Sequence, residues 1–268
     1  MGEFIMSGST WISIDFDDLR HLPKHSGHPT RSKKAHQTTA TKELSSDFQR
    51  GMVALEKWLN SNDYPVTFFI IADLFENPTF TTWLQAIISQ FSQRITIGNH
   101  GLTHRSWSAW PEDVAGFENA LIESNIILKQ YCEPNLRPWF RAPAGYIAPW
   151  MAPILAKNGF EVDSSVNPSW LLKRKTGKDK SWSKVIESMT QNGIREIAWR
   201  TKWSLPINGP ALHIPILKII AKREWRNSPV VDCLDDCLKS DKQITALYWH
   251  LLDHSRNEAT WSPPLQQI

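Results

Sequence analysis

The sequence predicts an α/β protein built around a mostly parallel β-sheet. Short segments of strand character alternate with amphipathic segments of helical spacing along most of the 268 residues. This order is typical of βαβ units, in which helical crossovers join parallel strands of an open or barrel-like sheet. A second observation supports it, because five clusters of polar residues each follow a strand-like segment. Folds of this class collect their chemistry in the loops at the carboxyl ends of the strands.

Seven segments have the composition of buried strands, because each is short and rich in apolar, aromatic and β-branched residues. The clearest of them reads PVTFFIIA and begins at Pro65. The expected strands cover 11–16, 65–72, 95–98, a segment that ends at Trp139-Phe140, 160–162, 194–199 and 244–249.

Helices are expected between these strands, where apolar residues recur with helical spacing. Ser46 or Asp47 can cap the first helix, which continues through Leu59. The other expected helices cover 80–92, 112–131, 149–158, 181–191, 215–224 and 229–239. A polar segment from Leu19 to about Thr41 is expected to be a loop; it carries several Lys and Arg and the histidines His21, His25, His28 and His36.

The composition is that of an ordinary soluble globular protein, with 41% hydrophobic and 21% charged residues and a net charge of +3. This charge is too small to predict a nucleic-acid partner. No signal peptide is recognisable, and no segment approaches the roughly 18–20 apolar residues that a membrane span requires. The three cysteines, Cys132, Cys233 and Cys237, lack the spacing of a disulfide framework. We therefore expect a cytoplasmic protein with reduced thiols.

The candidate functional site combines the acidic cluster IDFDD with the sequence HGLTH. Asp15, Asp17 and Asp18 lie within four residues, and their mutual repulsion is unfavourable unless a cation offsets it. His100 and His104 would share one face of a helical turn, so that both rings could bind one ion. Two histidines and a carboxylate, from Asp17 or Asp18, leave coordination positions for water and substrate, which is typical of a catalytic metal site.

Five motifs, in this order, resemble those of the polysaccharide deacetylase, or NodB-homology, family of metal-dependent carbohydrate esterases. They are FDD at 16–18, HGLTH at 100–104, RAPAGY at 141–146, DSS at 163–165 and LYWH at 247–250. The resemblance spans residues 11 to about 254. It implies a single domain over 11–268 that folds as a distorted, seven-stranded (β/α) barrel. Residues 1–10 are then a tail that includes cloning-derived residues, and a basic loop lies at about 20–43.

The resemblance also implies a role for each motif. Asp18, His100 and His104 would bind a divalent metal, in first place Zn, with Co, Ni or Mn as alternatives. Asp17 would be the general base that takes a proton from water, and Arg141 would pair with it.

The remaining motifs would bind the substrate and supply the general acid. The backbone N–H of Tyr146, in one turn with Pro143 and Gly145, would stabilise the oxyanion. His250 would protonate the leaving amine, and Asp163 would hold its ring.

Several residues depart from the family pattern or allow a second interpretation. Leu19 stands where the family has Gly after its paired aspartates. His254 is a rival to His250, which is preferred because it directly ends the strand. Asp163 could instead cap the turn that follows it, and Asp15 is expected only to hydrogen-bond to the adjoining loop.

We expect an amidohydrolase that removes an N-acyl group, in first place acetyl, from an amino sugar of a polysaccharide or of its lipid- or nucleotide-linked precursor. Such a reaction belongs to the synthesis of surface polysaccharides such as O-antigen or capsule, and the basic loop suits a phosphate-bearing precursor. The alternatives are a deformylase for a formylated amino sugar and a non-catalytic carbohydrate-binding protein with the same fold. A nucleic-acid partner is not expected, and any membrane contact would be peripheral.

Overall fold

Seven parallel strands form the central sheet. The computed structural model describes residues 9–25, 28–32, 42–231, 234–239 and 243–266. The strand order is β6-β5-β4-β3-β2-β1-β9, and each neighbouring pair is parallel. The strands are β1 Ser9–Phe16, β2 Val66–Ile70, β3 Ile95–Asn99, β4 Leu136–Phe140, β5 Val162–Asp163, β6 Arg195–Glu196 and β9 Ile244–His250.

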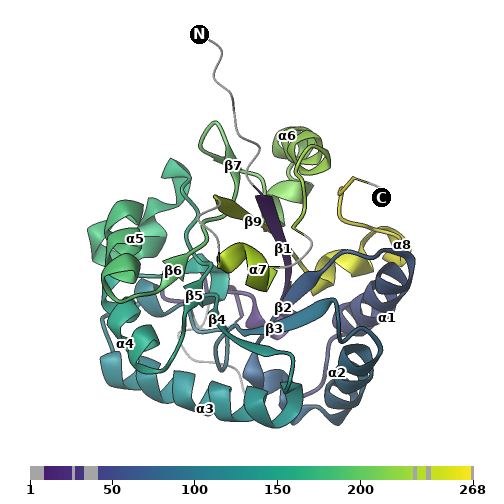
Figure 1. Ribbon diagram of the computed structural model, residues 1–268, viewed down its shortest axis with the longest axis horizontal. Helices are drawn as coiled ribbons and strands as arrows, with labels where there is room; N and C mark the ends of the chain where they lie inside the picture. The colour runs from purple at the N-terminus through teal and green to yellow at the C-terminus, as the bar shows by residue number, and fades with distance from the viewer. Residues whose placement is uncertain (1–8, 26–27, 33–41, 232–233, 240–242, 267–268) are drawn as a thin grey trace.

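The sheet curls into a distorted barrel, which confirms the predicted fold class (Figure 1). Its two edges meet just beyond β6, where the Ala246 N–H donates to the Ala198 carbonyl at 3.0 Å and the Arg200 N–H donates to the Ala246 carbonyl at 2.8 Å. A strand was expected over 194–199, but only its first part forms a regular ladder with β5. The closing contact is a single bridge between Trp199 and Ala246.

Helices surround the sheet on its outer side (Figure 1). Because helices cover one face and side chains fill the other, β2 is buried along its whole length, as expected of a parallel sheet. The first helix is capped by Ser45, one residue before the expected caps, through its side chain and the Phe48 N–H. The helices are α1 Ser46–Ser61, α2 Pro78–Gln90, α3 Val114–Cys132, α4 Ala152–Lys157, α5 Trp182–Gln191, α6 Pro215–Arg226, α7 Leu234–Leu238 and α8 Arg256–Ala259.

The expected helix over 229–239 is wrong in its first half. Pro229 has no N–H, and its carbonyl accepts from the Thr10 N–H at 2.8 Å, while the Val231 N–H donates to the Thr10 carbonyl at 2.9 Å. This segment is therefore extended beside β1, and the helix is reduced to α7. Sequence reasoning also missed the two-stranded hairpin of β7 Thr201–Lys202 and β8 Leu205–Pro206. His36 and Cys233 lie outside the described residues.

The register of the sheet brings the ends of five strands to one level. Asp15 of β1 pairs with His250 of β9, and Asn99 of β3 pairs with Phe140 of β4. Between them, β2 ends at Ile70, level with Asn99 on one side and Phe16 on the other. The residues that directly follow these ends therefore meet at one edge of the sheet.

Within the described ranges, no helix has both the length and the apolar character needed to cross a bilayer.

The packing of β3 against β2 predicts the effect of one substitution. A Cβ atom at Gly98 would lie 2.5 Å from the Phe69 ring, and this ring lies 4.1 Å from the buried Arg141 guanidinium. Gly98→Ala should lower the free energy of unfolding by about 1–3 kcal/mol through overpacking, measured by chemical denaturation. Ser92→Ala, in the exposed loop before the same strand, should change it by less than about 0.5 kcal/mol. Equal stabilities of the two variants would contradict this account of the core.

Candidate metal centre and catalytic cavity

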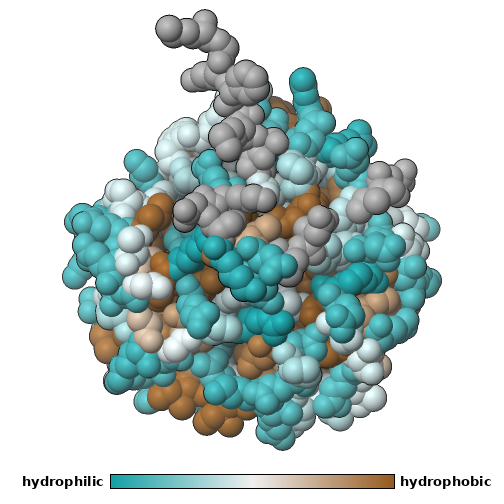
Figure 2. Space-filling model, viewed as in Figure 1, coloured by the Kyte–Doolittle hydropathy of each residue, from teal (hydrophilic) through white to brown (hydrophobic). Residues whose placement is uncertain are grey.

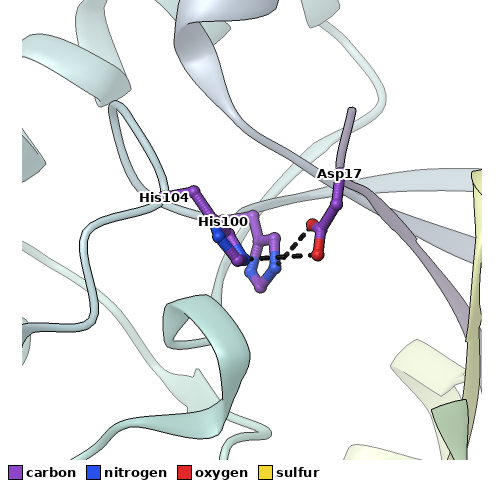
Figure 3. Close-up of side chains that lie close together, drawn as sticks. All are labelled: Asp17, His100 and His104. Carbon is purple, nitrogen blue, oxygen red and sulfur yellow. Dashed lines mark ion pairs between the residues drawn. The ribbon is translucent and has the colours of Figure 1, made fainter. Parts of the chain in front are cut away.

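Asp17, His100 and His104 form a buried cluster at the carboxyl ends of β1 and β3 (Figure 3). One Asp17 oxygen lies 3.3 Å from His100 Nε2, and the other lies 3.3 Å from His104 Nε2. One ligand atom from each of the three side chains lies within 4.8 Å of the other two. Tetrahedral ligands at about 2.0–2.2 Å from an ion would be roughly 3.3–3.6 Å apart, so the two short distances fit a shared divalent ion.

The hydrogen bonds of the two histidines prepare both rings to bind a metal. His100 Nδ1 lies 2.7 Å from the Arg141 carbonyl, and His104 Nδ1 lies 2.6 Å from the His21 carbonyl. Because a carbonyl can only accept, each Nδ1 carries the proton and each Nε2 presents a lone pair. Both Nε2 atoms and Asp17 Oδ1 are buried without a hydrogen-bond partner. Buried lone pairs without a partner are unfavourable unless an ion binds to them.

The pKa values reflect the crowding of charge in this cluster. Burial and the neighbouring His100 and His21 rings lower the pKa of His104 to about 4, against the opposing effect of Asp17. Burial alone would lower the pKa of His100, but the charges of Asp15 and Asp17 raise it. Burial has the opposite effect on a carboxylate and would raise the pKa of Asp17, but the imidazoles of His104 and His100 hold it well below its usual range. A divalent ion would compete with the proton for the ring of His100.

The HGLTH segment is a loop, so the expected helical turn is wrong. Gly101 has φ 85° and His104 has φ 60°, both in the left-handed region. Such a φ is uncommon for a residue other than Gly and interrupts any helix. The Asn99 side chain accepts from the Gly101 N–H at 2.6 Å and fixes the start of the loop. The two rings converge through this folded loop, with centroids 5.1 Å apart.

Asp18 lies outside the cluster, so the prediction that it is the metal ligand is wrong. Its carboxylate accepts from the Leu19 N–H at 2.6 Å, from the Ser45 N–H at 3.0 Å and from the Ser45 hydroxyl. It caps the short 3-10 helix Leu19–His21 and ties it to the start of α1. Alternation along an extended strand explains the difference, because Asp15 and Asp17 share one face and Asp18 points to the other.

Arg141 pairs with Asp15, so the predicted pairing of Arg141 with Asp17 is wrong. Its guanidinium donates to an Asp15 oxygen at 2.7 Å and to the Ser13 hydroxyl at 2.8 Å. It also donates to the Ser164 carbonyl and hydroxyl, and it is fully buried. The other Asp15 oxygen lies 3.9 Å from His100 Nε2. Asp15 is therefore a buried carboxylate that pairs with Arg141 and lies directly beside the Asp17–His100–His104 cluster.

His250 faces the cluster, but its acidic partner is Asp253 and not the predicted Asp163. His250 Nε2 lies 3.8 Å from Asp17, and Nδ1 lies 3.7 Å from Asp253. Burial opposes protonation, but Asp253 and Asp17 raise the pKa of His250 to about 9. Asp253 also accepts from His213 Nε2 at 2.7 Å and from the His250 N–H at 3.0 Å. The His-x-x-Asp spacing was the sequence signal for this pair.

Asp163 belongs to a separate buried group. Its carboxylate accepts from the Ser165 hydroxyl at 2.7 Å and from the Ser165 N–H at 3.1 Å, which agrees with the second interpretation of this residue as a turn cap. Burial raises the pKa of Asp163 in spite of these bonds and of a hydrogen bond with Glu196. The next residue, Ser164, accepts a hydrogen bond from the Arg141 guanidinium, so Asp163 lies one residue from the Arg141 site.

His254, the rival to His250, is part of the core. It is fully buried, and its Nε2 accepts from Trp249 Nε1 at 3.0 Å. Its ring also packs on Trp58 and Trp261. Burial lowers the pKa of His254 to about 4, so the ring is neutral near pH 7.

The RAPAGY turn places Ala144, not Tyr146, at the cavity. The Tyr146 N–H donates to the Pro143 carbonyl at 3.1 Å, so the expected oxyanion donor is engaged in the turn. The Tyr146 ring is buried against His28, with centroids 4.9 Å apart. Gly145 has φ 67°, and a Cβ there would lie 2.8 Å from the Trp199 ring. Ala144, with φ 51°, lines the cavity instead.

A cavity of about 580 Å³ opens over the cluster, a size that suits a sugar residue. Asp17, His104 and His250 line it together with two cations that sequence reasoning had not placed there, Arg31 and Lys175. Lys175 Nζ donates to the Ala144 carbonyl at 2.6 Å. Burial and the positive charges of Arg31 and Arg174 lower the pKa of Lys175 to about 7. This wall therefore favours an anionic group.

Comparison with known proteins agrees with this fold. A family model described as polysaccharide deacetylase matches residues 36–162, which include both cluster histidines and Arg141. A comparison with curated proteins found no match. A candidate polysaccharide deacetylase from Mycobacterium smegmatis is 14% identical, with a TM-score of 0.50 over 95% of this chain and 81% of that one. A GH57-type branching enzyme from the hyperthermophilic archaeon Pyrococcus horikoshii is 10% identical, with a TM-score of 0.51 over 98% and 69%. At these identities the two structures show the fold alone.

The cluster geometry predicts different effects at two adjacent aspartates. Asp17→Asn should weaken binding of Zn²⁺ by more than the roughly 10–100-fold that loss of an outer-shell partner causes. Asp18→Asn is the matched control and should bind Zn²⁺ like the unaltered protein, because its carboxylate is occupied by Ser45 and Leu19. Titration with a competing chelator measures both affinities. The reverse ranking would restore Asp18 as the ligand.

The buried His254 predicts a loss of stability in acid. Its pKa is lower in the folded chain, about 4, than the roughly 6.5 of an unfolded chain. Between these two pKa values the unfolded state thus binds one more proton than the folded state. The contribution of His254 to the free energy of unfolding is therefore complete above about pH 6.5. It should be lost at about 1.4 kcal/mol per pH unit as the pH falls towards 4. In chelator, His254→Gln should show a shallower decline in unfolding free energy from pH 7 to 5; parallel declines would show that His254 does not titrate there.

Proposed function

We propose that this chain is a member of the polysaccharide deacetylase family, whose model matches residues 36–162. In this proposal it is a hydrolase of carbon–nitrogen bonds other than peptide bonds, and it removes the acetyl group from an N-acetylated amino sugar. The observation that carries the proposal is the buried Asp17–His100–His104 cluster, whose unsatisfied donor atoms lie at a cavity of sugar size. Two imidazoles and one carboxylate suit zinc, and we infer that zinc is the ion. When bound, it would polarise the amide carbonyl and lower the pKa of water.

Asp15 is the general base in this proposal, in place of Asp17. Asp17 is the carboxylate of the ligand cluster, which leaves Asp15 as the nearest other carboxylate. Arg141 holds one Asp15 oxygen at 2.7 Å, so the carboxylate is fixed in position. The second oxygen lies on the side of His100 and receives the proton of the attacking water.

His250 is the general acid. Its Nε2 faces Asp17 across 3.8 Å and lines the cavity, so it can reach the amide nitrogen of a bound sugar. Asp253 on the Nδ1 side stabilises the charged ring and fixes its orientation through the backbone of the same turn. Proton delivery from Nε2 to the amide nitrogen lets the amine leave.

The cavity wall supports a phosphate-bearing substrate. Arg31 and Lys175 line the cavity together with the site residues. A sugar linked to a phosphate, as in a nucleotide- or lipid-linked precursor of a surface polysaccharide, would bring its anionic group to these cations. An N-formyl substrate would need the same catalytic residues, and the wall cations do not distinguish it from an N-acetyl one.

Asp15→Asn should retain zinc and lose about 10²–10⁴-fold in kcat, because it removes the proton acceptor. Mass spectrometry should follow loss of one acetyl group from N-acetylglucosamine 1-phosphate, UDP-N-acetylglucosamine, N-acetylglucosamine and a chitin oligosaccharide. Full activity of the Asp15→Asn enzyme would remove Asp15 from the base role. Absence of turnover of every substrate by the zinc-loaded protein would count against the deacetylase proposal.

Arg31→Gln should raise KM for the phosphorylated substrates by about 10-fold, because it removes one charge-assisted contact. Its KM for an uncharged sugar should not change. Lys173→Gln is the matched control, because Lys173 is exposed on the 3-10 helix Trp170–Asp179 that also carries Lys175. Equal effects of Arg31→Gln on charged and uncharged substrates would contradict the anion-binding role.

A further inference from the structure

The β7–β8 hairpin and helix α6 expose three large apolar side chains. Trp203 is 74% exposed, Ile216 75% and Ile219 73%, the highest values among the large hydrophobic residues that the structure describes. Trp203 and Ser204, with φ of 50° and 58°, form the two-residue turn of the hairpin, a conformation that suits a tight hairpin. Apolar residues on a surface are common singly, but a group of this kind marks an interaction site.

The hairpin and α6 form one surface. Lys202 of the hairpin pairs with Glu224 of α6 at 2.9 Å, and the two elements lie side by side at the upper edge of the molecule (Figure 1). The inner face of α6 is anchored by the buried Ala221 and Trp225. Because this face is packed in the core, Ile216 and Ile219 are held on the outer face.

The charges around these apolar residues are positive. The outer face of α6 also carries the exposed Lys218, Lys222 and Arg223, whereas its acidic residue, Glu224, is engaged by Lys202. Another apolar area lies over α3 at the lower edge (Figure 2), where Ile122 and Ile126 are exposed. That area differs because the exposed Glu123 lies within it.

We propose that the surface of Trp203, Ile216, Ile219, Lys218, Lys222 and Arg223 docks onto a membrane that contains anionic lipids. Trp and Ile side chains enter the boundary between headgroups and acyl chains, and Lys and Arg bind lipid phosphates. Anionic membrane surfaces bind amphipathic helices that have a basic rim and a neighbouring Trp. The contact is peripheral and reversible.

The docking surface continues into the wall of the catalytic cavity. Pro210 and His213 line the cavity, and both belong to the 3-10 helix Gly209–His213, which leads directly into α6. A docked molecule would therefore hold its cavity close to the lipid surface. If the proposed function is correct, the phosphate-bearing substrate of this enzyme is carried by a lipid rather than by a soluble nucleotide.

Vesicle sedimentation tests the docking surface with the zinc-loaded, full-length protein. The probes are vesicles of phosphatidylcholine alone and of an equal mixture of phosphatidylcholine and phosphatidylglycerol. The protein should bind the mixed vesicles at least about 10-fold more tightly than the neutral ones, and added salt should weaken this binding. The double variant Ile216→Ser, Ile219→Ser should lose at least about 10-fold in affinity for the mixed vesicles. Ile126→Ser, which removes the exposed isoleucine of α3, is the matched control and should bind normally.

Three results would overturn the proposal: no binding of the unaltered protein to mixed vesicles, equal loss in the α3 control, or a dimer in analytical ultracentrifugation that the double variant abolishes. The last result would make this face a subunit interface. Thermal unfolding of each variant confirms that it is folded. Hydrolysis of a soluble sugar phosphate by the same variants separates the two proposals, because failure of the deacetylase function would abolish it without affecting vesicle binding.

Discussion

The structure of the site depends on one buried cation, the guanidinium of Arg141. Its side chain binds Asp15 and Ser13 of β1 and Ser164 after β5, and its own carbonyl accepts from His100 Nδ1. A single residue thus fixes the Asp15 carboxylate beside the Asp17–His100–His104 cluster and the orientation of the His100 ring in that cluster. Because it is fully buried, the guanidinium is stable only while these partners remain, and they in turn would be unpaired without it.

Acidic side chains alternate with cationic or imidazole side chains, starting from the Arg141–Asp15 ion pair. Asp15 is held by Arg141, Asp17 lies among the three imidazoles of His100, His104 and His250, and Asp253 lies on the far side of His250. Each of these buried carboxylates is paired with at least one cationic or imidazole side chain. A divalent ion would complete the series, because the donor atoms that face the centre are the ones without partners.

The sequence predicted the strands well and the assignment of carboxylates poorly, for a local reason. Continuous apolar runs rich in β-branched and aromatic residues, such as β2, indicate buried strands of a covered sheet. In contrast, the choice among Asp15, Asp17 and Asp18 depends on which face of the chain each occupies. Ile12, Ile14 and Phe16 pack in the core, so strand alternation already places Ser13, Asp15 and Asp17 together on the other face. The motif resemblance pointed to Asp18 instead, because a motif position does not state which face of the strand a residue occupies.

The sequence by itself determined the α/β class, the order of the strands along the chain and part of the candidate site: the acidic cluster, His100, His104, Arg141 and His250. These follow from apolar periodicity and from residue types, which are local properties of a chain. Only the tertiary structure decided which carboxylate meets the histidines, that Asp253 rather than Asp163 supports His250, and that His254 belongs to the core. It also brought Arg31 and Lys175 to the cavity. Such pairings join residues far apart in sequence, or depend on the exact course of a turn, and the packing of the sheet fixes them.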